Sequence, residues 1–241
     1  MHSSAHYRQL LARLPQIAVA ADQFQVLNSA KDFKSRILSL IAGATQRIYL
    51  IALYLQDDEA GREILSALYA AKQRNPALDI KVFVDFHRAQ RGLIGKGKQG
   101  GNHLMYQAMA ARHEHQIEIY GVPVKGRELL GVLHLKGFIF DDILLYSGAS
   151  LNDIYLHQQE RYRFDRYHQI HSQALTCSMV NYVDDVFLKS EAVQRLDRPG
   201  IPGAKQLKGQ IRRFKHNLRT SQYRFESIPA NSQEIAITPM V

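Results

Sequence analysis

The chain has almost no cysteine, because Cys177 is the only one among its 241 residues. A single cysteine excludes a disulfide framework and a zinc site built from several thiolates, and it favours a reduced, cytoplasmic setting. The chain also lacks a long apolar run: its most apolar stretch, residues 38–55, is interrupted by Gln46 and Arg47 and falls short of a membrane-spanning helix. The N-terminal residues contain no apolar core of a secretory signal. We therefore expect any contact with a membrane to be peripheral.

Acidic residues are too few to balance the basic ones. The chain has 31 Lys and Arg against 22 Asp and Glu, which gives a formal net charge of +9. Such an excess favours anionic partners, namely nucleic acid, an anionic membrane surface or a phosphorylated substrate, without choosing among them. The hydrophobic content of 46% is that of a folded globular protein.

Hydrophobic periodicity predicts an α/β fold. A strand over 47–54, a helix over 62–74 and a strand over 79–85 form a βαβ unit, whose strands are parallel. We expect a mixed, mostly parallel sheet flanked by helices, in one domain over residues 1–200, followed by a basic helix and tail over 201–241. Further helices are predicted over 30–46, 104–112, 172–189 and 204–225, and strands over 117–120, 132–146 (two, joined by a tight turn) and 164–170.

A basic, glycine-rich loop follows the strand over 79–85. Between residues 86 and 101 it carries Arg88, Arg91, Lys96 and Lys98. The carboxyl end of a parallel strand is where open α/β sheets place ligands, and guanidinium groups suit phosphate oxygens. We therefore expect Arg88 and Arg91 to bind substrate phosphates or acidic lipid headgroups, with a merely solvated loop as the alternative.

One short stretch has the residues for phosphate chemistry. His134 and Lys136 stand two apart in a predicted strand, so both side chains point to the same face. Beside a phosphodiester, the lysine compensates charge and the imidazole attacks phosphorus or delivers a proton. Asp141 closes the strand, where it organises the turn or a neighbouring charge. The alternative is a chance His-x-Lys pair, which is common in a basic protein.

The stretch resembles the HKD signature of the phospholipase D superfamily. The match comprises His134-x-Lys136-x4-Asp141 and the trailing Gly148-Ala-Ser150-Leu-Asn152. The trailing part is one residue longer than the common G-S-x-N form, so the choice between Ser150 and Asn152 as phosphate contact stays open. The resemblance implies a phospholipase D-like domain with His134, Lys136 and Asp141 as its catalytic motif.

Within that superfamily, nearly the whole chain resembles the bacterial CDP-diacylglycerol–serine O-phosphatidyltransferases. The stretches that carry this resemblance are 51–55, 84–92, 121–123, 146–153 and 163–168. The resemblance implies CDP-diacylglycerol and L-serine as substrates, phosphatidylserine and CMP as products, no metal and no other cofactor. It also implies that His134 is the nucleophile, that Lys136 binds phosphoryl oxygens, and that the protein acts at the cytoplasmic side of the inner membrane.

Asp165 falls where the superfamily places a carboxylate that orients the histidine. A third group that fixes the tautomer and ring angle is a general requirement of such sites. The alternative is a surface ion pair among Arg161, Arg163 and Arg166.

Superfamily sites pair two HKD motifs, whereas this sequence has one. No second His-x-Lys is followed by an aspartate five residues beyond the lysine. We favour half of a longer enzyme, with residues 235–241 at the threshold of the other half. The alternatives are a homodimeric nuclease or phosphodiesterase and a catalytically silent lipid-binding chain. Nucleic acid is the less favoured partner, because the basic loops lack interleaved aromatics. The helix over 205–224 is expected to pack its apolar stripe on its own domain or to lie on anionic membrane.

Overall fold

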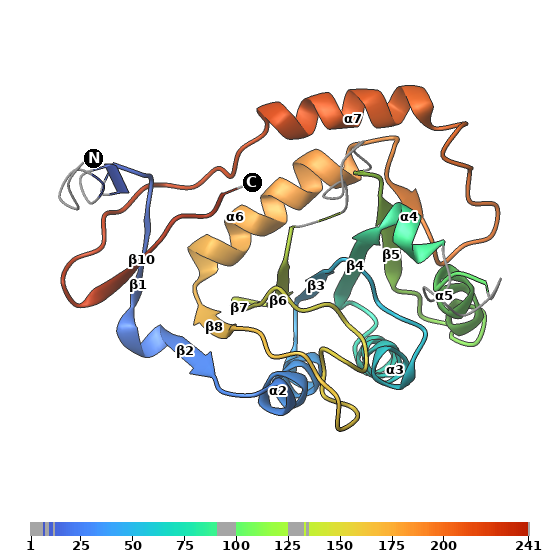
Figure 1. Cartoon of the computed structure of the whole chain (residues 1–241), viewed down its shortest axis with the longest axis horizontal. Coiled ribbons are helices and arrows are strands. Elements are labelled where there is room, and N and C mark those ends of the chain that lie inside the picture. The colour runs from blue at the N-terminus through green and yellow to red at the C-terminus, as the bar shows by residue number, and fades with distance from the viewer. Residues whose placement is uncertain are drawn as a thin grey trace.

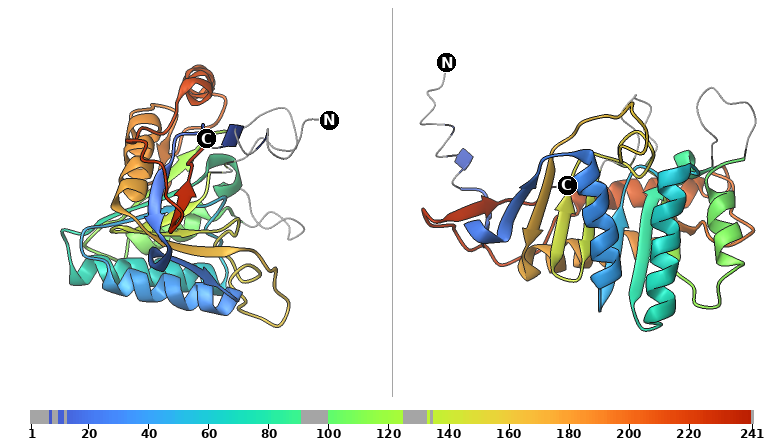
Figure 2. Two further views of the ribbon diagram at one scale, coloured as in Figure 1. Left: turned by 90° about the vertical axis from the view of Figure 1, so that its left-hand side faces the viewer. Right: turned by 90° about the horizontal axis from the view of Figure 1, so that it is seen from below.

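A computed structural model describes residues 7, 10, 11, 13–90, 100–124, 133 and 135–240. In this part of the chain a mixed sheet lies between two layers of helices (Figures 1 and 2). One layer contains α2 (Ala30–Gly43), α3 (Glu59–Arg74) and α5 (His103–Ala110), and the other contains α6 (Gln173–Val183) and α7 (Lys208–Thr220). The α/β class predicted from the sequence is confirmed.

Within the described residues the main sheet has eight strands in the order β2-β8-β7-β6-β3-β4-β5-β9. A separate two-stranded sheet joins β1 to β10. The strands are β1 (Ile17–Ala20), β2 (Phe24–Leu27), β3 (Arg47–Ile51), β4 (Asp79–Asp85), β5 (Glu118–Val122), β6 (Gly137–Phe140), β7 (Ile143–Tyr146), β8 (Tyr167–His171), β9 (Gln194–Arg195) and β10 (Glu234–Ile237). The short elements are η1 (Ala21–Gln23), α4 (Phe86–Ala89) and η2 (Asp184–Leu188), which is a π-helical turn.

The prediction of a mostly parallel sheet is wrong outside the βαβ unit. Strands β3, β4 and β5 are parallel to one another, as the βαβ pattern predicted. The other neighbouring pairs in the described part of the main sheet are antiparallel. The reason is local, because a tight turn at Asp141 and Asp142 joins β6 to β7, and such a hairpin requires antiparallel strands.

The strands alternate their side chains between two apolar cores. Ile48 and Leu50 of β3 are fully buried in the core under α2 and α3. Tyr49 and Ile51 point to the opposite face and pack in the core under α6, with Met179. This alternation, with a period of two, is why β3 reads as an apolar run and not as an amphipathic strand.

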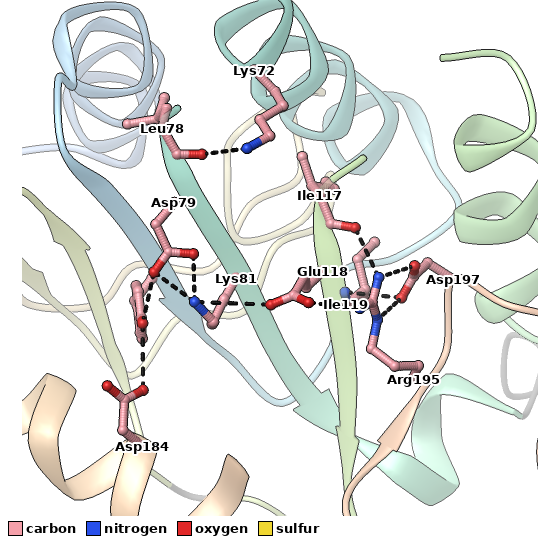
Figure 3. A network of polar contacts seen from close by, with 11 residues as sticks. Lys72, Leu78, Asp79, Lys81, Ile117, Glu118, Ile119, Asp184, Arg195 and Asp197 are labelled. Atoms are coloured by element: carbon pink, nitrogen blue, oxygen red, sulfur yellow. Dashed lines mark hydrogen bonds and ion pairs between the residues drawn. The ribbon is translucent and has the colours of Figure 1, made fainter. Parts of the chain in front are cut away.

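A polar network crosses the sheet near the edge where β4 and β5 begin (Figure 3). Arg195 of β9 contacts Glu118 of β5 at 2.7 Å and Asp197 at 2.6 Å. Lys81 of β4 pairs with Glu118 at 3.8 Å and also with Asp79. Lys81 and Arg195 thus each have acidic partners, and the contacts of Arg195 fasten β9 to the sheet.

Residues beyond 200 pack on the same body. Phe214 of α7 is 1% exposed and lies 5.9 Å, ring to ring, from Phe187 of η2. Farther on, β10 pairs with β1 at the other end of the chain, with Ile237 opposite Ile17. The apolar stripe of the basic helix therefore packs on its own domain, as the first of its two interpretations predicted. None of the helices within the described ranges is long and apolar enough to cross a membrane.

Candidate active site

The candidate site lies at the edge where β3 and β4 end. Leu55 and Leu151 form a parallel bridge beyond the named strands, and Leu151 donates a backbone hydrogen bond to the carbonyl oxygen of Tyr54 at 3.1 Å. On the other side, the backbone N–H of Asp85 donates to the carbonyl oxygen of Leu53 at 3.1 Å. Tyr54 is therefore placed between the end of β4 and the segment that follows β7.

Asn152 and Ser150 are buried at this edge, at 7% and 3% exposure. The Asn152 amide oxygen accepts from the Tyr155 backbone N–H at 3.0 Å, and its Nδ2 donates to the Tyr54 hydroxyl at 3.4 Å. The pKa of the Tyr54 phenol is raised, mainly by burial and secondarily by Tyr155. The charge of nearby Arg88 acts in the opposite direction but does not cancel the rise. Tyr54 thus stays protonated, and its ring also lies 5.7 Å from the Arg88 guanidinium.

The Asp165 carboxylate lies against the backbone of Gly148. A Cβ atom added at Gly148 would stand 2.7 Å from Asp165 Oδ2, so only glycine lets the carboxylate approach this closely. The other oxygen accepts from the Arg166 backbone N–H at 2.7 Å. Within the described part of the chain, Asp165 makes no salt bridge to Arg161, Arg163 or Arg166, so the geometry does not support the ion-pair interpretation.

Lys136 precedes β6 and does not lie in it. The predicted strand began at residue 132, whereas the ladder starts at Gly137, whose φ of +150° suits glycine. The Lys136 ammonium donates to the carbonyl oxygen of Leu133 at 3.2 Å. Burial lowers the pKa of Lys136 to about 8, and the charge of Asp85 opposes that shift.

An apolar cavity of about 590 Å³ adjoins this lysine. Lys136 is the only charged side chain among the described residues that line it. Most of the others are apolar and come from β7, α6, α7 and the chain after β10, including Leu144, Met179, Leu218 and Met240. The cavity wall explains why the ammonium is desolvated.

Asp85 is the residue that sequence reasoning missed. It is fully buried at the end of β4, and its Oδ1 caps α4 by accepting from the N–H groups of His87 and Arg88 at 2.9 and 2.8 Å. Its Oδ2 accepts from the N–H of Leu133 at 3.1 Å. Asp85 and Lys136 thus hold the N–H and the C=O of Leu133, the residue directly before His134. The available signal was an aspartate between a parallel strand and a helix start.

Two of the predicted site residues, His134 and Arg91, lie outside the described residues, as do Lys96 and Lys98. Arg88 is described and reaches Tyr54 as stated above. Among the residues whose positions are given, no group of three or more His, Cys, Asp or Glu side chains is placed to hold a metal ion.

Asp141 lies at the opposite edge from Lys136, with the whole of β6 between them. Its carboxylate accepts backbone hydrogen bonds from Thr45, Gln46 and Arg47 at 2.8–2.9 Å. Burial acts to raise the pKa of Asp141, but these hydrogen bonds outweigh it and lower the pKa. The structure therefore does not bring Asp141 to the site, and the contacts give it the turn-organising role.

Both the sequence and the fold of this chain resemble those of known proteins. No protein-family model matches the chain. It is 44% identical over 236 residues to the CDP-diacylglycerol–serine O-phosphatidyltransferase of Escherichia coli, covering 98% of this chain and 52% of the relative. The Haemophilus influenzae enzyme of the same name is 44% identical over 238 residues, covering 96% of this chain and 52% of the relative.

The fold agrees with that relationship. The crystal structure of phosphatidylserine synthase from Haemophilus influenzae superposes with a TM-score of 0.87 at 42% identity, over 99% of this chain and 51% of that one. The chain thus spans about half the length of the curated relatives it matches. By sequence and by fold, it belongs to the family of the bacterial phosphatidylserine synthases.

Proposed function

We propose that this chain provides one half of an active site that transfers a phosphatidyl group from CDP-diacylglycerol to L-serine. The observation that carries the proposal is the 44% identity, over 98% of the chain, to a transferase of that name. Lys136 and Asn152 of the motif, together with Asp165, support it, since they come from three segments that meet one edge of the sheet.

The reaction proceeds in two displacements at one phosphorus atom. A ring nitrogen of His134 attacks the phosphorus that bears the diacylglycerol, an N–P bond forms, and the P–O bond to CMP breaks. The serine hydroxyl oxygen then attacks the same phosphorus, the N–P bond breaks, and the hydroxyl proton passes to a base. Phosphatidylserine and CMP are the products, and the nitrogen is regenerated.

The remaining residues bind and orient. The Lys136 ammonium, protonated below its pKa of about 8, faces the phosphoryl oxygens during both displacements. Ser150 or Asn152 contacts the same phosphate, and Asp165 orients the His134 ring. Arg88 and Arg91 hold the pyrophosphate of CDP-diacylglycerol, for which guanidinium groups are suited. Asp141 is assigned no part in the chemistry.

A second half-site completes the reaction. The base that takes the serine proton and the acid that assists departure of CMP come from a second His-Lys motif, because the sequence contains a single such motif. It is supplied by the remainder of a longer enzyme or by a second copy of this chain. Because the donor substrate is a lipid, we place the protein at the cytoplasmic surface of the inner membrane.

The test is release of CMP from CDP-diacylglycerol in mixed micelles. We expect release to depend on serine when the chain is combined with the other half of a relative, and to disappear in His134→Ala. Exchange of labelled CMP into CDP-diacylglycerol without serine is expected as well, because the covalent step is reversible. Serine-dependent release that persists in His134→Ala would overturn the proposal.

A further inference from the structure

The loop that follows Asn152, residues 153–166, presents aromatic side chains to solvent. Phe164 is 68% exposed and Tyr162 is 46% exposed. Arginines alternate with them, and Arg161, Arg163 and Arg166 are all exposed as well. Single exposed apolar residues are ordinary, but here aromatic rings alternate with guanidinium groups, which corrects the expectation that the basic loops lack interleaved aromatics.

Packing and hydrogen bonds give the loop a defined conformation. Leu156 is fully buried and anchors its first half, while the Arg163 backbone N–H donates to the carbonyl oxygen of Ile154 at 2.9 Å. His157 stacks on Tyr162 with ring centroids 3.8 Å apart, which fixes the direction of that tyrosine. The loop projects beyond the ends of α2 and α3, where it is drawn in gold (Figure 2).

Most of the acidic charge in this loop is engaged by the protein. Asp153 accepts from the Ala60 backbone N–H at 2.8 Å, at the start of α3. Asp165 rests against Gly148. Glu160 is the exposed acid that remains, against three exposed arginines. The outward face is therefore cationic and aromatic.

We propose that this loop, residues 153–166, docks on an anionic lipid surface. Aromatic rings settle at the boundary between headgroups and acyl chains, and arginines near a membrane pair with anionic headgroups. The inference rests on the proposed function, whose donor substrate remains in a bilayer. The loop starts after Asn152 and ends beside Asp165, so docking brings both ends of the candidate site to the substrate phosphate.

The absence of tryptophan from the sequence gives a clean test. Phe164→Trp places one reporter in the loop, and Ala77→Trp places a matched one on the exposed turn between α3 and β4, at the opposite edge of the sheet. Vesicles of phosphatidylcholine with or without phosphatidylglycerol are then added, with brominated acyl chains as quencher. The emission of Phe164→Trp is expected to shift to the blue and to be quenched with the anionic vesicles, while Ala77→Trp stays unchanged.

Removing either the aromatic rings or an arginine of the loop should weaken its binding to anionic vesicles. The double change Tyr162→Ser and Phe164→Ser should weaken cosedimentation with anionic vesicles by roughly tenfold or more, and Arg161→Gln by about fivefold. Melting temperatures should change little, because these side chains are largely exposed and the stack of Tyr162 on His157 is a local contact of the loop.

Equal responses of the two tryptophans, or none, would overturn the docking proposal. A blue shift that grows with protein concentration without vesicles would also overturn it, because it would assign the loop to contact between copies. These vesicles contain no CDP-diacylglycerol or serine, so docking can hold while phosphatidyl transfer fails, and the reverse.

Discussion

At the scale of single residues, Leu133, which directly precedes His134, is fixed by hydrogen bonds at both its N–H and its C=O. The buried Asp85 carboxylate binds the Leu133 N–H at 3.1 Å, and the Lys136 ammonium binds the Leu133 carbonyl at 3.2 Å. A catalytic group is most effective when a second set of contacts fixes the segment that carries it. These two contacts fix the backbone directly before the histidine.

The first prediction concerns the charge of Lys136. Its ε-carbon resonance, identified by its loss in Lys136→Arg, should titrate near pH 8 instead of near 10.5. Because the folded state binds this proton less tightly than the unfolded chain does, Lys136 costs stability below pH 8. That cost disappears as the pH rises from about 8 to 10.5. A titration near the ordinary lysine value would show that the ammonium is solvated.

The second prediction concerns Asp85. Asp85→Asn removes the negative charge that raises the pKa of Lys136 and puts an amide N–H₂ where an acceptor is needed. We expect the Lys136 pKa to fall further below 8, and the free energy of unfolding to drop by about 1–3 kcal/mol. Asp22→Asn, at an exposed position, serves as the control and should change neither. An unchanged Lys136 titration in Asp85→Asn would show that Asp85 does not act on Lys136 and only caps α4.

The sequence was enough to identify the motif residues, but it did not reveal the contacts that hold them in place. The spacing of His134, Lys136 and the Gly/Ser/Asn cluster indicated the family, because those residue types carry chemistry. The spacing did not reveal that Asp85, from a strand about 50 residues earlier, meets Leu133. That contact depends on which strands become neighbours, and periodicity determines only the face that a side chain occupies.

At the scale of elements, the turn between β6 and β7 depends on Asp141. Its φ of 52° is a left-handed conformation, and its carboxylate binds three consecutive backbone N–H groups at the start of β3. The aspartate of the motif therefore links a hairpin to the neighbouring strand.

The third prediction follows from this role. Asp141→Ala leaves those N–H groups without their acceptor, so the free energy of unfolding should fall by about 2–4 kcal/mol in urea melts. The half-buried neighbour Asp142, which is 3.3 Å from Arg47, provides the control, and Asp142→Ala should cost under about 1 kcal/mol. Wild-type stability in Asp141→Ala, together with loss of activity, would instead show that Asp141 takes part in the reaction.

The fourth prediction tests the approach of Asp165 to the backbone. Gly148→Ala puts a methyl group 2.7 Å from Asp165 Oδ2, which is closer than van der Waals contact allows. The carboxylate must move, so CMP release by the completed site should fall at least tenfold while the melting temperature changes little. Gly43→Ala, where a Cβ meets nothing within 4 Å, is the matched control. Full activity in Gly148→Ala would exclude the assigned position of Asp165.

The elements themselves were largely predictable, and their pairing was less so. Ser29 caps α2 by accepting from the Asp32 N–H at 3.0 Å, which is the usual role of a serine directly before a helix. The βαβ unit gave the parallel centre of the sheet. The antiparallel outer strands depend on long-range register, for example β2 with β8, which no local pattern specifies.

At the scale of the whole molecule, the net charge of +9 and the single motif are both consistent with half of a phosphatidyltransferase that works at a membrane surface. The cationic surface suits an anionic membrane, and one His-Lys motif suits half of a site with two. Solution mass separates the two ways of completing it. A monomer requires the other half of a longer enzyme, whereas a twofold dimer can bring two copies of His134 together.

We propose that His134 forms a covalent bond to the phosphatidyl phosphorus, and the transfer reaction depends on this bond. The leaving CMP is a phosphate whose second pKa is near 6, so the acid of the second motif speeds its departure but is not required. The first displacement should therefore proceed, more slowly, even in half a site. Intact-mass spectrometry after incubation with CDP-diacylglycerol, quenched at alkaline pH, should show one added phosphatidyl group in the wild-type chain and none in His134→Ala. The same adduct in His134→Ala, or no adduct in either protein, would contradict the account.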